Sequence, residues 1–393
     1  MAVLLALPLM GQVRTGNIFG RVVDQEGNPL PGVSVTLSCL LTAPMTTITS
    51  SEGTFRFLSL SPAKDYTIKL ELTGFKTKIE TGIIVNVGTN TSLTLVMEQG
   101  VLEEQITVTA VTPMVDTKKT AVGTNVTQKV LQSLPTARDP WVILQMAPSI
   151  IVDRENVWGS ESGQHSNYVT QGSATYNNNV WVMDGIVITD PAAIGASPSY
   201  YDFDAFEEMQ ITVGGADVTV QTGGIALNMV TRRGGNRVSL GGRFYMVDEK
   251  FQAENAEKVA ELKKKEPGLV GINRIRNNKD YGFNMGMPIV KDKAWLWASY
   301  GIQDIKTNIV FGTSDETLLE NYAAKINPQL IPANRFEAFV HIGGKKKWGR
   351  SATAQNPEGL YQQGRYHFGS PIVKFQDEHM FGNNFFLSLK YNY

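Results

Sequence analysis

The sequence predicts a mainly β protein in three folded parts: a seven-stranded β-sandwich, a small α/β domain, and the first strands of a transmembrane antiparallel β-barrel. Residues 16–98 alternate short β-prone runs with turn residues. Residues 117–232 mix short helical and strand patterns, and residues 233–393 alternate apolar with polar side chains. A strand with one apolar and one polar face is typical of a barrel that touches lipid outside and a polar lumen inside.

Residues 1–11, MAVLLALPLMG, form an apolar run that is too short to span a bilayer. The run matches the hydrophobic region of a signal peptide, but the basic residues expected before it are missing. We interpret it as a signal-peptide remnant, cleaved near Gly11–Gln12. The sequence therefore predicts an exported protein.

Charge and cysteine content limit the chemistry. Residues 1–231 carry 12 Lys or Arg and 21 Asp or Glu, whereas residues 232–393 carry 24 and 16. This asymmetry fits internal electrostatic complementarity, a polyanion near the basic half, or solvated loops alone. Cys39 is the only cysteine, and the four histidines lack ligand spacing. We expect no disulfide, no metal and no cofactor.

The sandwich prediction for residues 16–98 rests on about seven short strands separated by turns such as 25–29 and 51–53. No nucleophile, base or metal ligands cluster there. The segments GRVVDQEGNPLPGVSVTL, SSEGTFRFLSL and YTIKLELTGFKT resemble the carboxypeptidase regulatory-like domain, a transthyretin-like sandwich. That resemblance implies a fold and says little about activity.

Residues 99–116 read as a linker with one β-prone run, Ile106–Thr109. From composition alone the run is a linker element or the last strand of the sandwich. It could also add as an extra strand to the sheet edge of another protein, because main-chain hydrogen bonds supply affinity there almost independently of side chains.

Residues 117–232 form the α/β domain. Residues 127–134 and 139–146 are predicted helices, the second with Pro140 at its first position. Predicted strands lie at 180–183, 210–213 and 226–231. The Gly- and Asn-rich composition with a modest core indicates a compact plug inside a larger shell.

Five segments occur in a family-specific order: LPTARDPWVILQMAPSI, NNNVWVMDGIVITDP, FDAFEEMQITVGG, QTGGIALNMVTRRGGNRVSLGGRFY and FNMGMPIVKDKAWLWASY. Together they resemble TonB-dependent outer-membrane receptors that carry an N-terminal regulatory-like domain. The resemblance implies a plug within a barrel, in the outer membrane of a Gram-negative-type bacterium. It also implies a TonB box just ahead of the plug, which donates a strand to a TonB-like periplasmic energy transducer. The TonB-box candidates are Gln105, Ile106, Thr107, Val108, Thr109 and Ala110.

Residues 233–393 contain seven predicted strands, near 237–247, 280–288, 294–305, 318–328, 335–345, 366–377 and 384–393. Long and short connections alternate, as in outer-membrane barrels whose tight turns are periplasmic. Residues 318–326 also fit a helix, and 249–265 reads as a charged helix in the first long loop. Trp295, Trp297, Tyr281 and Tyr393 are candidates for interfacial aromatic girdles. Lys345–Lys347 are candidates for solvated rim charges, with contact to lipopolysaccharide phosphate as the alternative.

A barrel of this class closes with roughly 22 strands of ~9–11 residues, so the strands alone need ~220 residues. Residues 233–393 are too few. We therefore expect a partial barrel, in the form of a curved open sheet beside the plug.

The sequence favours a TonB-dependent receptor that takes up or binds a large or scarce solute. Its expected partners are the TonB-like protein, outer-membrane lipid and an unknown solute, with no nucleic acid. Tyr200, Tyr201 and Phe203 are candidates to face the ligand, with core packing as the alternative. The alternative function is a secreted or surface-attached binding or adhesion protein whose sandwich binds. No catalytic residue is predicted, because no nucleophile or phosphate loop accompanies the acidic pairs at 202/204 and 207/208.

Overall fold

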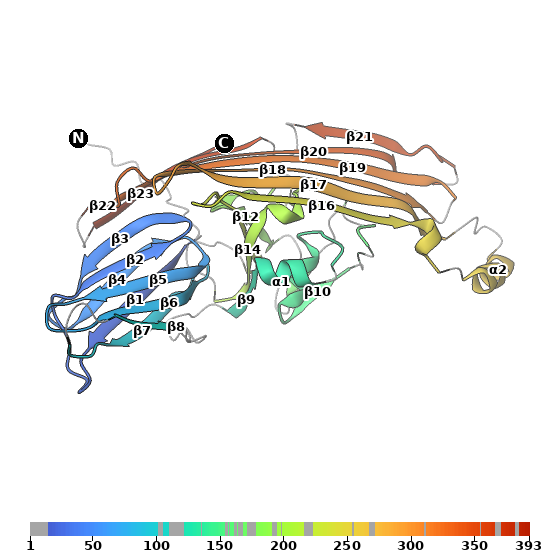
Figure 1. The fold of residues 1–393 in the computed structure, drawn as a ribbon. Coiled ribbons are helices and arrows are strands. Elements are labelled where there is room, and N and C mark those ends of the chain that lie inside the picture. The colour runs from blue at the N-terminus through green and yellow to red at the C-terminus, as the bar shows by residue number, and fades with distance from the viewer. Residues whose placement is uncertain are drawn as a thin grey trace, which may run out of the picture.

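The computed structural model contains a sandwich, a plug domain and one long sheet (Figure 1). The long sheet extends over the plug, and the sandwich lies at one end of both. The structure describes residues 15–393 except 101–104, 110–121, 135, 154–155, 157, 161–162, 164–167, 171–177, 191–194, 198, 216–222, 254, 267–271, 310–311, 354, 366–370 and 382–384. The predicted signal-peptide remnant therefore lies outside the described residues.

The sandwich pairs two sheets, with strand orders β4-β1-β7 and β3-β2-β5-β6-β8. Its first seven strands are β1 (Gly16–Val23), β2 (Ser34–Cys39), β3 (Thr42–Ile48), β4 (Thr54–Leu60), β5 (Ala63–Glu71), β6 (Thr77–Val85) and β7 (Asn90–Val96). Alternate side chains of β2 point inward, so that Val35 and Leu37 are fully buried. Tyr66 is also buried there, and its hydroxyl donates to the Ser61 carbonyl at 2.9 Å. The predicted seven-stranded sandwich is confirmed.

An eighth strand, β8 (Gln105–Thr109), extends the larger sheet of the sandwich. It runs parallel to β6, with Thr77 opposite Gln105 and Thr81 opposite Thr109. Composition alone left this run as either a linker element or the last strand of the sandwich. In the structure it is the last strand of the sandwich.

The plug is built on a five-stranded sheet with the order β13-β12-β15-β14-β9. These strands are β9 (Val122–Thr127), β12 (Val180–Met183), β13 (Ile186–Val187), β14 (Phe206–Gly214) and β15 (Ala226–Thr231). The two-stranded sheet β10 (Ile150–Val152) and β11 (Tyr168–Thr170) and the helix α1 (Gln128–Ser133) complete it. The predicted second helix is shorter than expected, a 3₁₀ helix at Val142–Met146. It begins later because the Asp139 carboxylate accepts the Trp141 N–H at 2.8 Å, in a turn ahead of the helix.

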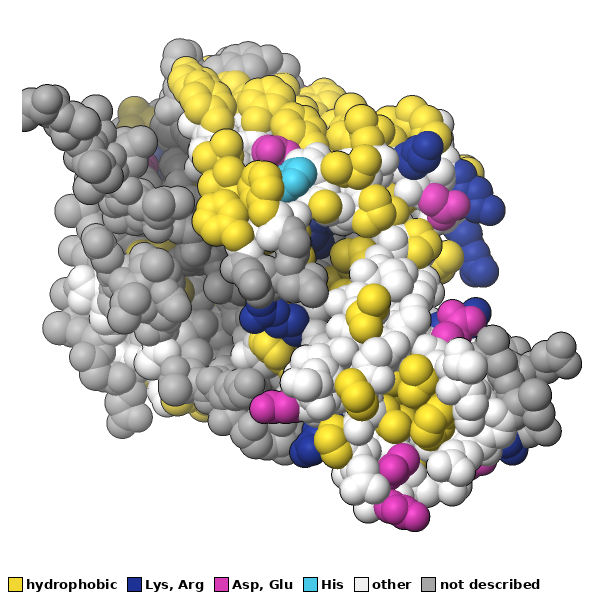
Figure 2. Space-filling view, turned by 90° about the vertical axis from the view of Figure 1, so that its left-hand side faces the viewer, with side chains coloured by type: hydrophobic (Ala, Val, Ile, Leu, Met, Phe, Trp, Pro, Cys, Tyr) yellow, Lys and Arg dark blue, Asp and Glu magenta, His cyan; other side chains and the backbone are white. Residues whose placement is uncertain are grey.

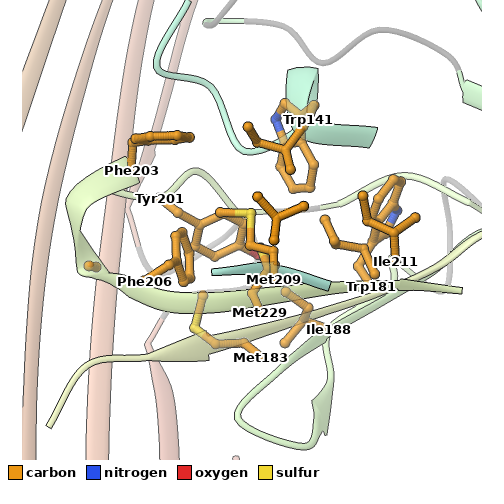
Figure 3. Packing of buried hydrophobic residues seen from close by; sticks show 14 of the residues in the cluster. Trp141, Trp181, Met183, Ile188, Tyr201, Phe203, Phe206, Met209, Ile211 and Met229 are labelled. Atoms are coloured by element: carbon orange, nitrogen blue, oxygen red, sulfur yellow. The ribbon is translucent and has the colours of Figure 1, made fainter. Parts of the chain in front are cut away.

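The plug has a packed core that is rich in aromatic and Met side chains (Figure 3) and continues into buried residues of the long sheet such as Trp297 and Phe339. The Trp141 ring packs edge-on against the rings of Trp181 and Tyr201, with centroids 5.0 and 5.7 Å away. Met209 and Met229 from neighbouring strands are fully buried in the same cluster. These contacts make the plug a packed body rather than a loop, despite its Gly- and Asn-rich composition.

The long sheet has the order β16-β17-β18-β19-β20-β22-β23, and β21 also pairs with β20. The strands are β16 (Ser239–Asp248), β17 (Arg274–Val290), β18 (Ala294–Asn308), β19 (Ser314–Pro328), β20 (Asn334–Arg350), β21 (Leu360–Arg365), β22 (Ile372–Phe381) and β23 (Phe385–Asn392). β21 and β22 pair with successive halves of β20, so both occupy one strand position. All paired neighbours are antiparallel, and the edge strands β16 and β23 do not pair with each other. The expected open sheet is confirmed.

Two further predictions concern the fourth predicted strand and the first long connection. The helical alternative for 318–326 is wrong, because β19 forms continuous ladders with β18 and β20 that satisfy its backbone on both sides. The charged helix predicted at 249–265 is confirmed for its second part only, as α2 (Ala256–Lys265), all of whose residues are at least partly exposed. A short 3₁₀ helix, Glu249–Phe251, precedes it.

The outer face of the long sheet is apolar. Leu240, Phe244 and Phe283 are more than half exposed on it, and Figure 2 shows hydrophobic side chains gathered along the top of the molecule, over this sheet. The girdle assignment of Trp295 and Trp297 is wrong, because both rings are on the inner face and 1–2% exposed. No helix in the described part of the chain is long and apolar enough to cross a membrane.

Candidate functional site

The plug meets the inner face of the long sheet through buried charges. The first group surrounds the turn between β12 and β13, where Asp184 (φ 47°) and Gly185 (φ 75°) adopt left-handed conformations. The Asp184 carboxylate is 1% exposed and lies 2.8 Å from Nζ of Lys325 on β19. It also accepts hydrogen bonds from the hydroxyl and N–H of Thr231, at 2.5 and 3.1 Å. The turn is thus fixed on both its plug side and its sheet side.

Two further lysines of the long sheet bind the main chain of the same turn. Nζ of Lys374 donates to the Asp184 carbonyl at 2.8 Å, and Nζ of Lys390 to the Gly185 carbonyl at 3.2 Å. Lys374 is fully buried, and Glu337 balances its charge at 2.6 Å. Lysines from β19, β22 and β23 therefore converge on one plug turn, which we call the Asp184 anchor. Removing one partner of such a buried pair costs about 3–5 kcal/mol.

The second group joins plug residues Arg138, Asp202 and Asp204 to Arg243 on β16 and Asp280 on β17. The Arg243 guanidinium lies 2.6 Å from Asp202 and 2.7 Å from Asp280. Arg138, whose φ is 54°, lies 2.9 Å from both Asp204 and Asp280. We call this group the Arg243 cluster. Burial raises the pKa of Asp202, and the adjacent Arg243 charge opposes that rise.

The sandwich also contacts the plug and the long sheet. The buried carboxylate of Glu208 on β14 accepts the Val87 N–H at 3.1 Å and the Asn125 side-chain amide at 2.9 Å. On the other side, the Asn236 N–H donates to the Leu40 carbonyl at 2.8 Å. The sandwich thus contacts both the plug and the region beside the long sheet.

The TonB-box candidates lie apart from these charge groups. Gln105, Ile106, Thr107, Val108 and Thr109 form β8 on the sandwich, and Ala110 lies outside the described residues. The structure therefore gives this segment a regular extended backbone at a sheet edge, which is the geometry that strand donation requires.

The three ligand-facing candidates do not form an open surface. Tyr201 and Phe203 are 3% and 2% exposed and lie in the plug core. Both rings therefore pack in the core, which was the alternative to facing a ligand. The Tyr201 hydroxyl lies 3.1 Å from the hydroxyl of Ser197, and burial raises its pKa. Tyr200 faces the long sheet, where its hydroxyl accepts from Nζ of Lys345 at 2.8 Å. The burial of Tyr201 and Phe203 excludes a ligand surface for these two rings, whereas Tyr200 is partly exposed and its candidacy stays a prediction.

Sequence reasoning missed the Asp184 anchor. The sequence offered one indication of it, because Lys374 and Lys390 lie among polar residues that alternate with apolar ones. That pattern predicts which face of the sheet carries the lysines, but it does not predict which residues they contact. Among the described residues, no group of three His, Cys, Asp or Glu side chains is placed to hold a metal ion.

Two comparisons with known proteins bear on the family. Residues 17–98 match the carboxypeptidase regulatory-like domain family. The TonB-dependent transporter Oar of Myxococcus xanthus is 27% identical over 302 residues, which cover 73% of this chain and 26% of that protein. The chain is a homologue of TonB-dependent transporters.

The chain spans about a quarter of the length of this transporter homologue. The solved structures that this chain resembles include the siderophore receptor PirA of Acinetobacter baumannii, at 13% identity and a TM-score of 0.48 over 66% of this chain and 38% of that one. The ferric enterobactin receptor PfeA of Pseudomonas aeruginosa matches at 11% identity and a TM-score of 0.49, over 69% and 40%.

Proposed function

We propose that this protein is a TonB-dependent receptor that takes up or binds a large or scarce solute. The observation that carries the proposal is the Asp184 anchor: a packed plug held by buried ion pairs against the polar face of a long antiparallel sheet. The opposite face of that sheet is apolar, which supports contact with outer-membrane lipid. Homology to a TonB-dependent transporter supports the same function.

Energy would reach the plug through residues 105–110. A TonB-like periplasmic protein would pair with β8, and a pull on that strand would pass along the chain to β9, the edge strand of the plug sheet. An edge strand has a neighbour on one side only, so fewer hydrogen bonds resist its removal than resist that of a central strand. Peeling β9 from β14 would loosen the plug without breaking the long sheet.

The substitution Val108→Pro tests this function, because proline removes a backbone N–H and breaks a strand ladder. Val108→Ala is the matched control, since it shortens the side chain and keeps the N–H. We expect Val108→Pro to abolish energised uptake while surface binding of the solute persists, and Val108→Ala to retain both. Uptake that survives Val108→Pro would reduce the segment to a tether.

Fractionation separates the receptor from a secreted binding protein. The receptor should sediment with outer membranes and need detergent for extraction, because its long sheet exposes an apolar face. Recovery of the intact protein from the soluble fraction in buffer alone would instead favour the secreted protein.

A further inference from the structure

The strand β8 occupies one edge of the larger sandwich sheet. In the order β3-β2-β5-β6-β8 it pairs with β6 alone among the described strands. The opposite edge strand, β3, lies beside the long sheet, where the Ala43 N–H donates to the side-chain oxygen of Gln329 at 3.2 Å (Figure 1). The edge formed by β8 therefore lies on the side of the sandwich that is farthest from the long sheet.

The sandwich fixes both β8 and the chain that leads to it. The β6–β8 ladder runs without a bulge over five residue pairs, from Thr77–Gln105 to Thr81–Thr109. Just before it, the Lys76 N–H donates to the Glu98 carbonyl at 2.9 Å and the Gly100 N–H to the Gly74 carbonyl at 3.1 Å. Residues 98–100 thus run alongside the turn between β5 and β6. These hydrogen bonds place the chain next to β6 before β8 begins.

We infer that the sandwich presents β8 to the energy-transducing partner, so that β8 stays paired with β6 while a partner strand adds to its outer edge. The inference rests on the proposed function of residues 105–110. A partner that replaced β6 would break one ladder to form another. A partner that adds at the outer edge forms its ladder and keeps the existing one, and it covers an edge that has no partner among the described strands.

This arrangement makes the sandwich part of the mechanical connection. The partner strand would be the sixth strand of the present five-stranded sheet. A pull on that strand would then load the whole sandwich, including the loop whose Val87 N–H binds Glu208 of the plug. Force would reach β14 through this contact as well as β9 through the covalent chain.

A disulfide between β6 and β8 tests whether β8 must leave the sandwich. Ile79 and Thr107 are register partners, so Ile79→Cys and Thr107→Cys in a Cys39→Ser background would lock the pair. The receptor would be purified from outer membranes in detergent. Its affinity for the periplasmic C-terminal domain of the host's TonB-like protein would then be measured in oxidised and reduced forms.

The matched control is a second cross-strand disulfide in the same domain, Thr36→Cys with Thr46→Cys, whose hydroxyls are 3.1 Å apart on β2 and β3. We expect the locked β6–β8 protein to bind within about twofold of its reduced form and of the control. Loss of binding by tenfold or more on oxidation of the β6–β8 pair alone would overturn the inference while leaving the proposed function intact. If neither the reduced variant nor the wild type binds, the proposed function fails, and the inference fails with it.

Discussion

Lys325 of the long sheet and Asp184 of the plug form a 2.8 Å ion pair in which both side chains are at most 2% exposed. A buried pair of this kind holds two bodies in one relative position, because neither charge can be left alone without a large desolvation cost. Such an ion pair suits a receptor that retains its plug at rest and releases it under force. The pair is stable while the plug is docked, and its stabilisation is lost once Lys325 and Asp184 separate.

Lys325→Met should therefore loosen the plug strongly. The uncompensated Asp184 carboxylate would destabilise the docked plug by about 3–5 kcal/mol. The measurement is hydrogen exchange of β12 and β15 in the detergent-solubilised receptor, which should speed up by orders of magnitude. Lys69→Met is the control, because it removes one partner of an exposed pair with Glu71 and should cost at most about 1 kcal/mol. The double variant Asp184→Asn with Lys325→Met should recover much of the loss, and failure to recover would show that packing rather than charge explains the effect.

Gly301→Ala tests the close approach of plug and sheet at the Arg243 cluster. A Cβ at position 301 would lie 2.7 Å from Cγ of Asp202 and 2.8 Å from Arg243, so the ion pair must shift. We expect a cost of about 1–3 kcal/mol in plug docking, as for other overpacked sites. Gly242→Ala is the control on β16, because its nearest heavy atom would be 3.9 Å away. Faster exchange around Asp202 in the first variant only is the expected result, and equal effects of both would remove the steric argument.

The sequence predicted the fold well where the alternation of apolar and polar residues determines which face of a strand points outward. Leu240 and Phe244 had to lie on the face opposite to Arg243, and they do, because a period of two leaves a strand no other arrangement. The same reasoning failed for Trp295 and Trp297. Aromatic rings are frequent both in membrane girdles and in packed cores, so residue type alone could not decide which face carried them.

The candidate site was less predictable, because its contacts join residues far apart in the chain. Lys374 and the Asp184 carbonyl are 190 residues apart, and no local pattern pairs a lysine with a distant turn. Lys345 was expected to be a solvated rim charge, but it is 6% exposed and donates to Tyr200. Its neighbours Gly344 and Lys346 give no alternation of apolar and polar residues that would assign it to a face. Only the plug packed against the sheet buries it.

Glu208→Gln should uncouple the sandwich from the plug with little change in shape. The carboxylate accepts from the Val87 N–H and the Asn125 amide, and a glutamine offers one oxygen where the carboxylate has two. Hydrogen bonds to charged groups are worth about 1.5–3 kcal/mol, so exchange of the Val87 amide should rise by roughly tenfold or more. Glu71→Gln, at an exposed site of the sandwich, should leave that amide unchanged. An unaltered Val87 amide in Glu208→Gln would mean that other contacts hold the two domains together.

Asp139 should make plug stability depend on pH. Its carboxyl is 3% exposed and bonded to the Trp141 N–H and the Asn156 amide, and burial raises its pKa to about 7. Because the folded-state pKa is raised above the ordinary 3.8, the folded plug keeps a proton that the unfolded chain has released. This group's contribution to stability is therefore complete below pH 3.8, falls as the pH rises, and is lost above about pH 7.

Asp139→Asn should remove this dependence, because an amide cannot lose the proton and Asn156 can rotate its own amide to offer an oxygen. The free energy of plug unfolding in the variant minus that in the wild type should rise by up to about 1.4 kcal/mol per pH unit between pH 5 and 7, and then level off. Urea-dependent exchange of the plug amides at several pH values measures both curves. Since other groups titrate equally in the two proteins, only the difference reports on residue 139. Parallel curves across this range would show that the carboxyl is already ionised in the folded plug at acidic pH.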